Sequence, residues 1–555
     1  MDQVGAGALV YARGDTEGDR RAKMVAAIER LPVYWLARRS VKEMCMRQSV
    51  ADTQADAGAL LEASPMACQL RSLIYVLDRA AQATLEMKTA GDADLYEPLE
   101  FVEAVRLQWD TRMRYQLRAF AAQQKRPLIA PRSKSSAARD DVAEPFPAHL
   151  VFSWADLLSD LENLVNPNAT ATFSNLKGFG LIKLSLKTPS LATLRERYRQ
   201  LSPDVRHVGL DDELAGLEWF RNQRYVEGER LLNDAQTTVA DLMRYAQTGV
   251  PASLRPRFWK RILGVWTSDR DVAYYERLIT QVRRWELITD DLYRLEVQET
   301  TDNAAYFVFE DMLDEIMLAF SRDSWLPKNS TLPLCLAPLT TNVFSEAAVP
   351  GRDDGAGYPF ADANGKLSPS LVENSGIEID DQGTATIPPC GVVPFHHQVM
   401  LAAPLCYLFQ RCEHTYFVFR HMYARYFCRL HTISSRPGTI LHLCKLFEDL
   451  VQSRSPQVFY HAVEVGMPPL RVVFPWLFTA FSGYLAVDQV LTLWDRILAY
   501  DSLELLAILA SAIFLFRSKS VLNATSSDEI RDIFEDGIYF RVMPLLQHFL
   551  FDSSR

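Results

Sequence analysis

Helical periodicity dominates the chain from Gly249 to its end, and one segment of 68 residues interrupts it. That segment, Pro327 to Pro394, holds nine prolines and seven glycines, with eight acidic and three basic residues. Proline lacks the backbone donor that a helix needs and clashes with the preceding turn, so this density excludes long helices there. We therefore expect a helical domain that carries a large loop insertion.

Composition and charge are those of a folded globular protein. Of the 555 residues 48% are hydrophobic and 23% are charged, and the formal net charge is -10. Such a surface, without a basic block, argues against binding to nucleic acid, whose phosphates require neutralising cations. The longest apolar run, Leu505 to Phe516, is shorter than the about twenty residues of a membrane span. The N-terminus also has no basic and apolar secretory signal, so we expect a soluble cytoplasmic protein without a transmembrane segment.

Neither the cysteines nor the histidines are spaced for a metal site. The eight cysteines lie at positions 45, 68, 335, 390, 406, 412, 428 and 444 and form no C-x-x-C pair. Histidines 396, 397, 414, 421, 431 and 442 also lack the regular short spacing of zinc ligands. We expect free thiols and no metal. The chain has no G-x-x-x-x-G-K-[ST] phosphate loop either, so a nucleotide would have to be bound by a partner.

Ahead of Gly249 the chain is expected to be mostly helical. Residues 1–129 are predicted as a helical region, since apolar residues recur every three or four positions from Val102 to Phe120. Residues 130–147 lose this periodicity and are predicted as a linker. Residues 148–248 are predicted as a mixed region with a helix at Trp154–Val165, a strand at Gly180–Lys187 and a helix at Glu229–Gln247.

Two stretches carry a resemblance to a known family. The first, GVPASLRPRFWKRILG at Gly249–Gly264, is a proline-initiated amphipathic helix. The second lies between Ser455 and Tyr500 and contains Trp476, Phe481, Ser482, Leu485, Leu491, Trp494 and Asp495. In this order the two stretches resemble the signatures of the TBC domain of Rab GTPase-activating proteins. The helical N-terminal region, the insertion and the sequence FVFEDMLDEIMLAFSRD further resemble the member-nineteen branch of the TBC1 family.

The resemblance implies an all-α, bilobal helical TBC domain at residues 249–551, with the insertion at about 327–394 outside its core. A mostly helical region with a short β element would precede it. Trp259, Trp476 and Trp494 should be buried. The implied partner is a Rab-type small GTPase of vesicle trafficking, with recruitment to endomembranes by peripheral association through partners. GTP and Mg²⁺ would be bound by that GTPase, so the chain is expected to have no cofactor of its own.

In this family an arginine and a glutamine act on the partner's GTP. The arginine belongs to a pattern Ile-x-x-Asp-x-x-Arg, which this sequence matches with Ile288, Asp291 and Arg294. On a helix these residues lie one above another, so Ile288 can anchor in the core while Asp291 holds the guanidinium. The same spacing also occurs in ordinary solvated Asp-Arg pairs. Leu295 and Glu296 follow where the family usually has Thr and Pro.

The glutamine belongs to a family pattern Tyr-x-Gln-Gly-Met, and the candidate is Gln398. Met400 is kept, whereas His396 replaces the tyrosine and Val399 replaces the glycine. Glycine permits torsions that valine avoids, so this loop is expected to depart from the family's geometry. Alignment on Pro404 would instead place His396 at the glutamine position, and that register stays open.

Two functions from different classes follow. The first is a GTPase-activating protein for a Rab-type GTPase, with Arg294 and Gln398 as catalytic residues and Ile288, Asp291 and His396 in support. The second is a TBC-fold scaffold, catalytically weak or inactive, that binds a GTPase or another partner. The intact arginine pattern favours the first function, and the altered glutamine motif with the long insertion favours the second.

Overall fold

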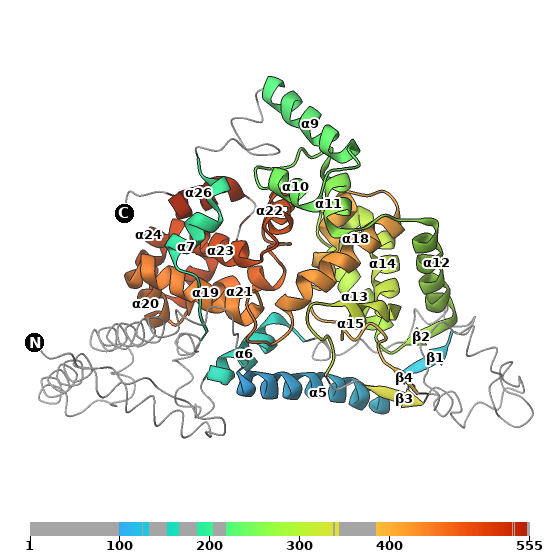
Figure 1. The fold of residues 1–555 in the computed structure, drawn as a ribbon. Coiled ribbons are helices and arrows are strands. Elements are labelled where there is room, and N and C mark those ends of the chain that lie inside the picture. The colour runs from blue at the N-terminus through green and yellow to red at the C-terminus, as the bar shows by residue number, and fades with distance from the viewer. Residues whose placement is uncertain are drawn as a thin grey trace, which may run out of the picture.

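Helices make up most of the structure, a computed structural model that describes residues 99–124, 126–132, 152–165, 186–203, 218–336, 339–342, 384–535, 537 and 539–551. Within these residues the strands are short and form two antiparallel pairs (Figure 1). The pairs are β1 (Ile129–Pro131) with β2 (Trp285–Leu287), and β3 (Thr340–Asn342) with β4 (Thr384–Thr386). The expectation of an all-α fold is therefore confirmed.

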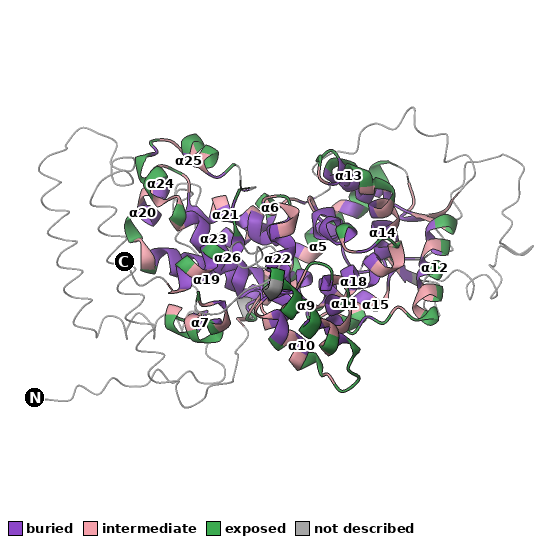
Figure 2. Ribbon diagram, turned by 90° about the horizontal axis from the view of Figure 1, so that it is seen from above, coloured by how far each residue is buried: buried purple, intermediate pink, exposed green. Residues whose placement is uncertain are grey.

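The helices form two lobes that lie side by side in Figure 1. The first lobe contains α11 (Arg255–Leu263), α12 (Asp269–Arg284), α13 (Asp290–Thr301), η6 (Phe307–Phe309), α14 (Glu310–Arg322), α15 (Trp325–Asn329), η7 (Val399–Leu401), η8 (Ala403–Tyr407), α18 (Cys412–Arg425) and η9 (Phe427–Leu430). The second contains α19 (Ile440–Arg454), α20 (Pro456–Glu464), α21 (Pro469–Phe478), α23 (Glu504–Phe516), α24 (Ser518–Asn523), α25 (Ser527–Ile533) and α26 (Val542–Phe551), with α7 (Leu191–Arg197) and η5 (Arg199–Leu201) packed on α26. In Figure 2 buried residues gather on the inner sides of these helices and exposed residues on their outer turns.

The first signature stretch folds as predicted. Pro256 lies in the first turn of α11, where its missing donor costs nothing. The apolar face that the periodicity predicted is buried throughout and consists of Leu254, Phe258, Trp259, Ile262 and Leu263. Gly264 ends the helix in the left-handed conformation with a φ of 71°, which glycine adopts without a steric penalty.

The single helix predicted at Glu229–Gln247 is wrong, because the structure has two helices there. They are α9 (Glu218–Asn233) and α10 (Val239–Ala246). Thr238 begins the second with a capping box: its side chain accepts from the Asp241 amide, and the Asp241 carboxylate accepts from the Thr238 amide. This reciprocal cap starts a new helix after the intervening polar residues, and it outweighs the continuous apolar periodicity that the prediction used.

A buried carboxylate joins the two signature stretches, of which α11 belongs to the first lobe and α22 contacts α23 and α26 of the second. Asp495, on α22 (Val487–Tyr500), accepts a 2.6 Å hydrogen bond from the Trp259 indole and a 2.9 Å bond from Nε of Arg255. All three residues are at least 98% buried. Because a buried carboxylate is stable only when donors satisfy it, α11 and α22 are held at fixed positions.

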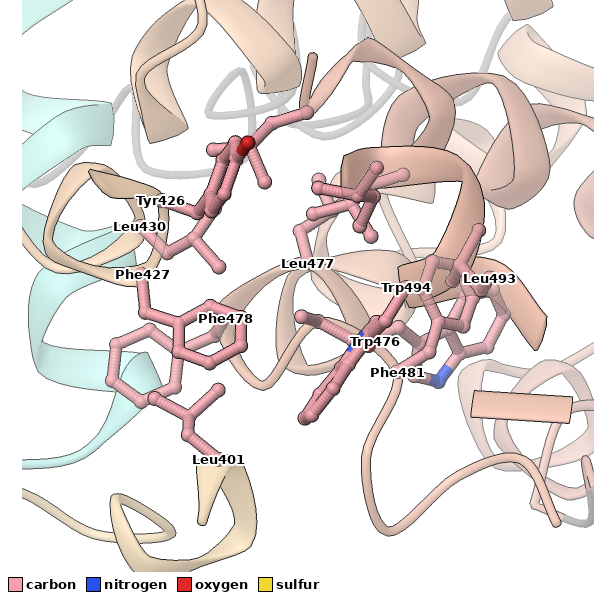
Figure 3. Close-up of a cluster of buried hydrophobic side chains, with 14 of the residues drawn as sticks. Leu401, Tyr426, Phe427, Leu430, Trp476, Leu477, Phe478, Phe481, Leu493 and Trp494 are labelled. Carbon is pink, nitrogen blue, oxygen red and sulfur yellow. The ribbon is translucent and has the colours of Figure 1, made fainter. Parts of the chain in front are cut away.

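The aromatic residues around this contact fill the junction of the lobes. Figure 3 shows side chains from η7, η9, α21 and α22 packed together. The ring of Trp494 lies 5.1 Å from that of Phe427, and its indole donates to the Ala480 carbonyl at 3.0 Å. The prediction that Trp259, Trp476 and Trp494 are buried is confirmed.

Helix α5 (Glu100–Gln123) lies along the lower edge of the molecule in Figure 1, with α6 (Trp154–Val165) beside it. Both helices fall where the periodicity predicted them. Arginines of α5 reach the ends of the insertion: Arg114 donates to the Gly391 carbonyl at 2.9 Å and Arg118 to the Thr340 carbonyl at 2.8 Å. Residues near both ends of the insertion therefore contact α5.

The expectation that Pro327 to Pro394 lies outside the core is wrong for the two ends of that segment. Leu339, Ala385 and Ile387 are buried in a second, smaller core together with α5, β1 and β2. Cys390 and Val392 belong to the main core. Pairing of β3 with β4 brings these residues together, and strands this short leave no readable alternation in the sequence. Residues 343–383 lie outside the described part.

Other predictions fall partly on residues that the structure does not describe. The predicted linker begins with Ala130 and Pro131, which belong to β1, while residues 133–151 are outside the described ranges. So are residues 1–98 and most of the predicted strand Gly180–Lys187, of which Leu186 and Lys187 are described and are not in a strand. The six described cysteines are free thiols. None of the described helices combines the length and apolarity that crossing a membrane requires.

Replacing the carboxylate that joins the lobes should destabilise the protein. We expect Asp495→Ala to lower the free energy of unfolding by about 3 to 5 kcal/mol, because it leaves the buried Arg255 guanidinium and Trp259 indole without their acceptor. Chemical denaturation followed by tryptophan fluorescence measures this. Asp528→Ala, which removes an exposed Asp-Arg pair on α25, serves as the control and should leave the unfolding curve unchanged. Equal stability of the two variants would show that the buried contact does not hold the lobes together.

Candidate functional site

Two buried contacts fix the start of α13, which carries the arginine pattern. One lies in the residues just before the helix, and the other lies in its first turn. Ile288 is buried in the second core with Leu287 and Leu292, as the sequence predicted. It precedes α13, however, and does not lie on the helix with Asp291 and Arg294 as expected. Asp290 accepts a 3.1 Å hydrogen bond from the Leu287 amide and a 2.6 Å bond from Arg322 of α14, and both of these charged side chains are fully buried. The buried ion pair therefore ties the first turn of α13 to α14. Sequence analysis missed it, since a contact between residues 32 positions apart leaves no local pattern.

Arg294 projects from the second turn of α13 with 36% of its side chain exposed. Its guanidinium donates to Oδ1 of Asp291 at 3.2 Å, so the contact predicted from the spacing is present. The other oxygen of Asp291 accepts from Arg126 at 2.9 Å. Arg294 also faces Asp314, whose pKa is raised by burial and lowered in part by the guanidinium. The site thus holds an accessible cation beside two carboxylates.

Gln398 is placed differently, because its whole side chain is buried. Neither atom of its amide has a partner in hydrogen-bond geometry among the described residues, although its side chain interacts with the Tyr293 hydroxyl. The following residues form η7, which packs against α13. A partner protein that docks on this surface cannot reach Gln398 unless the loop moves.

The two histidines before Gln398 are held by a carboxylate of α13. Nδ1 of His396 lies 3.1 Å from Oε1 of Glu296 and 3.1 Å from Oε2 of Glu299. The His397 amide donates to the other oxygen of Glu296 at 2.7 Å. His397 has a φ of 67°, the left-handed region, whereas Val399 continues in η7. The unusual torsion of this loop is therefore at His397 and not at the position where the family has glycine.

Burial and hydrogen bonds within this cluster raise the pKa values of some members and lower that of another. Burial raises the pKa of Glu296, and its hydrogen bond to His396 opposes that rise. Glu296 raises the pKa of His396, chiefly through the same hydrogen bond. Burial, with the neighbouring His396 charge, lowers the pKa of His397 to about 4. The raised pKa of His396 favours the protonated imidazole beside the carboxylates, whereas a pKa of about 4 makes His397 neutral at pH 7.

The same three side chains could hold a divalent cation. Ligand atoms of Glu296, Glu299 and His396 all lie within 4.8 Å of one another. Sequence analysis expected no metal, and it could not detect this cluster, because His396 is 100 residues from Glu296. A protonated imidazole between two carboxylates accounts for the contacts without an ion, so the geometry gives no reason to prefer a metal.

The arginine and the glutamine loop occupy different sides of α13. Successive residues of a helix are rotated by about 100°. Tyr293 interacts with Gln398 and Glu296 holds His396, so the glutamine loop covers the side of the helix that these residues share. Arg294 is rotated about 100° from Tyr293 and about 160° from Glu296. The structure therefore brings His396 and Gln398 to α13 but does not bring Arg294 and Gln398 face to face.

Comparisons with known proteins match one part of the chain to a family model and most of the chain to a relative. The Rab-GTPase-TBC domain family matches residues 398–522. TBC1 domain family member 19 of Homo sapiens is 36% identical over 470 residues, which are 82% of this chain and 83% of that protein. The predicted resemblance to the member-nineteen branch is thereby confirmed.

Two solved structures are similar at a lower level. The Ypt/Rab-GAP domain of Gyp1p is 15% identical with a TM-score of 0.38, over 59% of this chain and 97% of that one. The flagellar RabGAP TBC domain of Chlamydomonas is 14% identical with a TM-score of 0.39, over 66% of this chain and 98% of that one.

The His396 cluster should make stability depend on pH. Because the folded protein raises the pKa of His396 above the ordinary 6.5, its contribution is complete below about pH 6.5 and is lost as the pH rises through the folded value. We expect the melting temperature of the wild type to fall with pH above 6.5 more steeply than that of His396→Gln. His548→Gln, at an exposed position of α26, is the control and should follow the wild type. Identical slopes for the wild type and His396→Gln would contradict the assignment.

Proposed function

This chain belongs to the family of proteins with a Rab-GTPase-TBC domain, and on that basis we propose that it accelerates GTP hydrolysis by a Rab-type small GTPase. In this proposal Arg294 enters the GTPase's active site. The GTPase binds GTP and Mg²⁺, and the present chain contributes side chains in trans. The protein would act where its partner resides, on endomembranes of vesicle trafficking, and would be recruited there through the partner.

An inserted arginine addresses the main obstacle of the reaction. Negative charge on the transferring phosphoryl group is poorly compensated in a small GTPase alone, and a guanidinium compensates it with several directed hydrogen bonds. Such an arginine typically raises the rate by about 10³ to 10⁵, which is about 4 to 7 kcal/mol of barrier. Arginine suits this role because it stays protonated and presents a planar set of donors.

The observation that carries the proposal is the presentation of Arg294. Its backbone is fixed by the buried Asp290–Arg322 pair and by Ile288 in the second core, while the side chain itself is 36% exposed and held at one point by Asp291. A single exposed ion pair costs little to break. The guanidinium can therefore leave Asp291 for a phosphate without disturbing the helix beneath it.

Gln398 would contribute less to catalysis than Arg294 while its loop holds the conformation seen in the structure. Positioning the attacking water requires a side chain that reaches the GTP, and Gln398 is fully buried beside Tyr293. The GTPase's own glutamine can orient the water instead. We therefore propose a division of labour in which this chain supplies mainly the positive charge.

A second candidate function is binding of a GTPase without acceleration. The burial of Gln398 favours it. An exposed apolar surface after α13 suits partner binding under both functions. This surface consists of Phe307 and Val308 of η6 with Tyr407 of η8, which are 62%, 63% and 50% exposed. The ring of Tyr407 packs 5.0 Å from that of Phe309, so the surface is rigid at its base. Measured stimulation of hydrolysis separates the two functions.

Substitutions at the two candidate residues should have unequal effects. We expect Arg294→Ala to lower stimulated hydrolysis by about 10³-fold or more and Arg294→Lys to recover little of it, since lysine lacks the planar fork. Gln398→Ala should cost less. Multiple-turnover hydrolysis across a panel of GTP-loaded Rab proteins measures this, with Arg283→Ala, at an exposed position of α12, as the control. Full stimulation by Arg294→Ala would refute its assigned role, and a wild type that binds without stimulating would establish the second function.

The apolar surface should affect binding and not chemistry. We expect Phe307→Ser to weaken the affinity for the GTP-loaded GTPase about tenfold, equivalent to about 1.4 kcal/mol, because it removes exposed apolar area that a partner would cover. The hydrolysis rate at saturating concentration should stay unchanged. Tyr539→Ser, at another highly exposed aromatic residue, is the matched control. Equal affinities for the two variants would exclude this surface from the interface.

A further inference from the structure

Arg126, in the turn between α5 and β1, makes two charged contacts to the segment that carries the arginine pattern. Its Nη1 donates to Oδ2 of Asp291 and its Nη2 donates to Oε1 of Glu286, each at 2.9 Å. The side chain is 31% exposed, less than that of Arg294. Arg126 is 165 residues away from Asp291 in the sequence, so the N-terminal region reaches directly into the candidate site.

Asp291 thereby binds two arginines with different oxygens. Oδ2 accepts from Arg126 and Oδ1 lies 3.2 Å from Nη1 of Arg294. An aspartate at i, i+3 alone holds an exposed arginine only weakly and can rotate about its own side-chain bonds. With one oxygen fixed by Arg126, the carboxylate cannot turn to bind Arg294 with both oxygens. Arg294 is then oriented by one hydrogen bond, which its Nη1 donates to Oδ1 of Asp291. A phosphate oxygen can replace Oδ1 as the acceptor.

The backbone on both sides of Arg126 is tied to the same segment. Strand β1 pairs with β2 in the register Ile129 to Leu287, and the Ile288 amide donates to the Leu128 carbonyl at 3.1 Å. Side chains of α5 and β1 bury the residues that precede and begin α13. In this second core the N-terminal side consists of Leu117, Phe120, Ala121, Leu128 and Ile129, and the other side consists of Leu287, Ile288 and Leu292. Without α5 and β1 the turn that positions α13 would lose this cover.

We infer that Arg126 is a positioning residue for Arg294, and that residues 99–124 and 126–132 are an integral part of the site that presents the arginine. The inference rests on the proposed function of Arg294. A helical domain that began at Gly249 would contain Arg294 but would lack the side chain that fixes Asp291 and the strand that fixes β2. The N-terminal region would then set the rate at which the bound GTPase hydrolyses GTP, and not the affinity for it.

Steady-state hydrolysis with the full chain and a GTP-loaded Rab tests this. We expect Arg126→Ala to lower kcat by about 10- to 100-fold, since a misplacement of about 1 Å has effects of this size, with KM changed less than twofold. Arg126→Lys should recover part of kcat, because an ammonium can reach Asp291 but cannot bridge to Glu286 as the guanidinium does. The matched control is Arg112→Ala, which removes an arginine of α5 that binds a carboxylate, Asp160, at 2.9 Å.

The outcomes separate the inference from the proposed function. If Arg294→Ala abolishes stimulation while Arg126→Ala keeps the wild-type kcat, the inference is wrong and the proposed function stands. If Arg126→Ala raises KM and leaves kcat, or lowers the melting temperature far more than Arg112→Ala does, Arg126 acts on binding or stability and the inference is also wrong. If the wild type stimulates no GTPase of the panel, the proposed function fails and the inference fails with it.

Discussion

The buried carboxylate of Asp495 is the contact on which the arrangement of the two lobes depends. It sits on α22 and binds Arg255 and Trp259 of α11, 240 and 236 residues away. A carboxylate in this environment would be costly if its donors were missing, and the strict geometry of an indole and a guanidinium leaves few alternative arrangements. The family's signatures contain this arginine, this tryptophan and the Trp-Asp pair. These signature residues therefore serve mainly the fold. Chemistry has to come from other positions.

Those positions are grouped around α13, which has two functionally different sides. One side is closed: Tyr293 and Glu296 hold the glutamine loop, bury Gln398 and fix His396. The other side is open, and Arg294 is exposed there beside a carboxylate shared with the N-terminal region. In the proposed function, charge stabilisation by Arg294 would need no rearrangement of the loop, whereas water positioning by Gln398 would need one.

The sequence predicted the local features of the structure and missed most of the long-range ones. Helices α5, α6 and α11 and the buried tryptophans followed from apolar periodicity, which is a local property. The break before α10 was missed because the capping box at Thr238 outweighs a periodicity that continues across it. The buried ends of the insertion, the Asp290–Arg322 pair and the contacts of Arg126 could not be predicted, since their partners are distant in sequence and no regular spacing marks them. Asp291 beside Arg294 was predicted because both lie on one helix face.

We propose that Arg294 acts on the transferring phosphoryl group and not on binding of the GTPase. The most direct measurement compares the affinity of the full chain for a Rab loaded with GTP and for the same Rab loaded with GDP and aluminium fluoride, which mimics the transition state. Because a residue that acts in the transition state strengthens binding to such a mimic by about 10²-fold or more, we expect much tighter binding to the aluminium fluoride form and loss of this difference in Arg294→Ala. Equal affinity of the wild type for the two forms would contradict it.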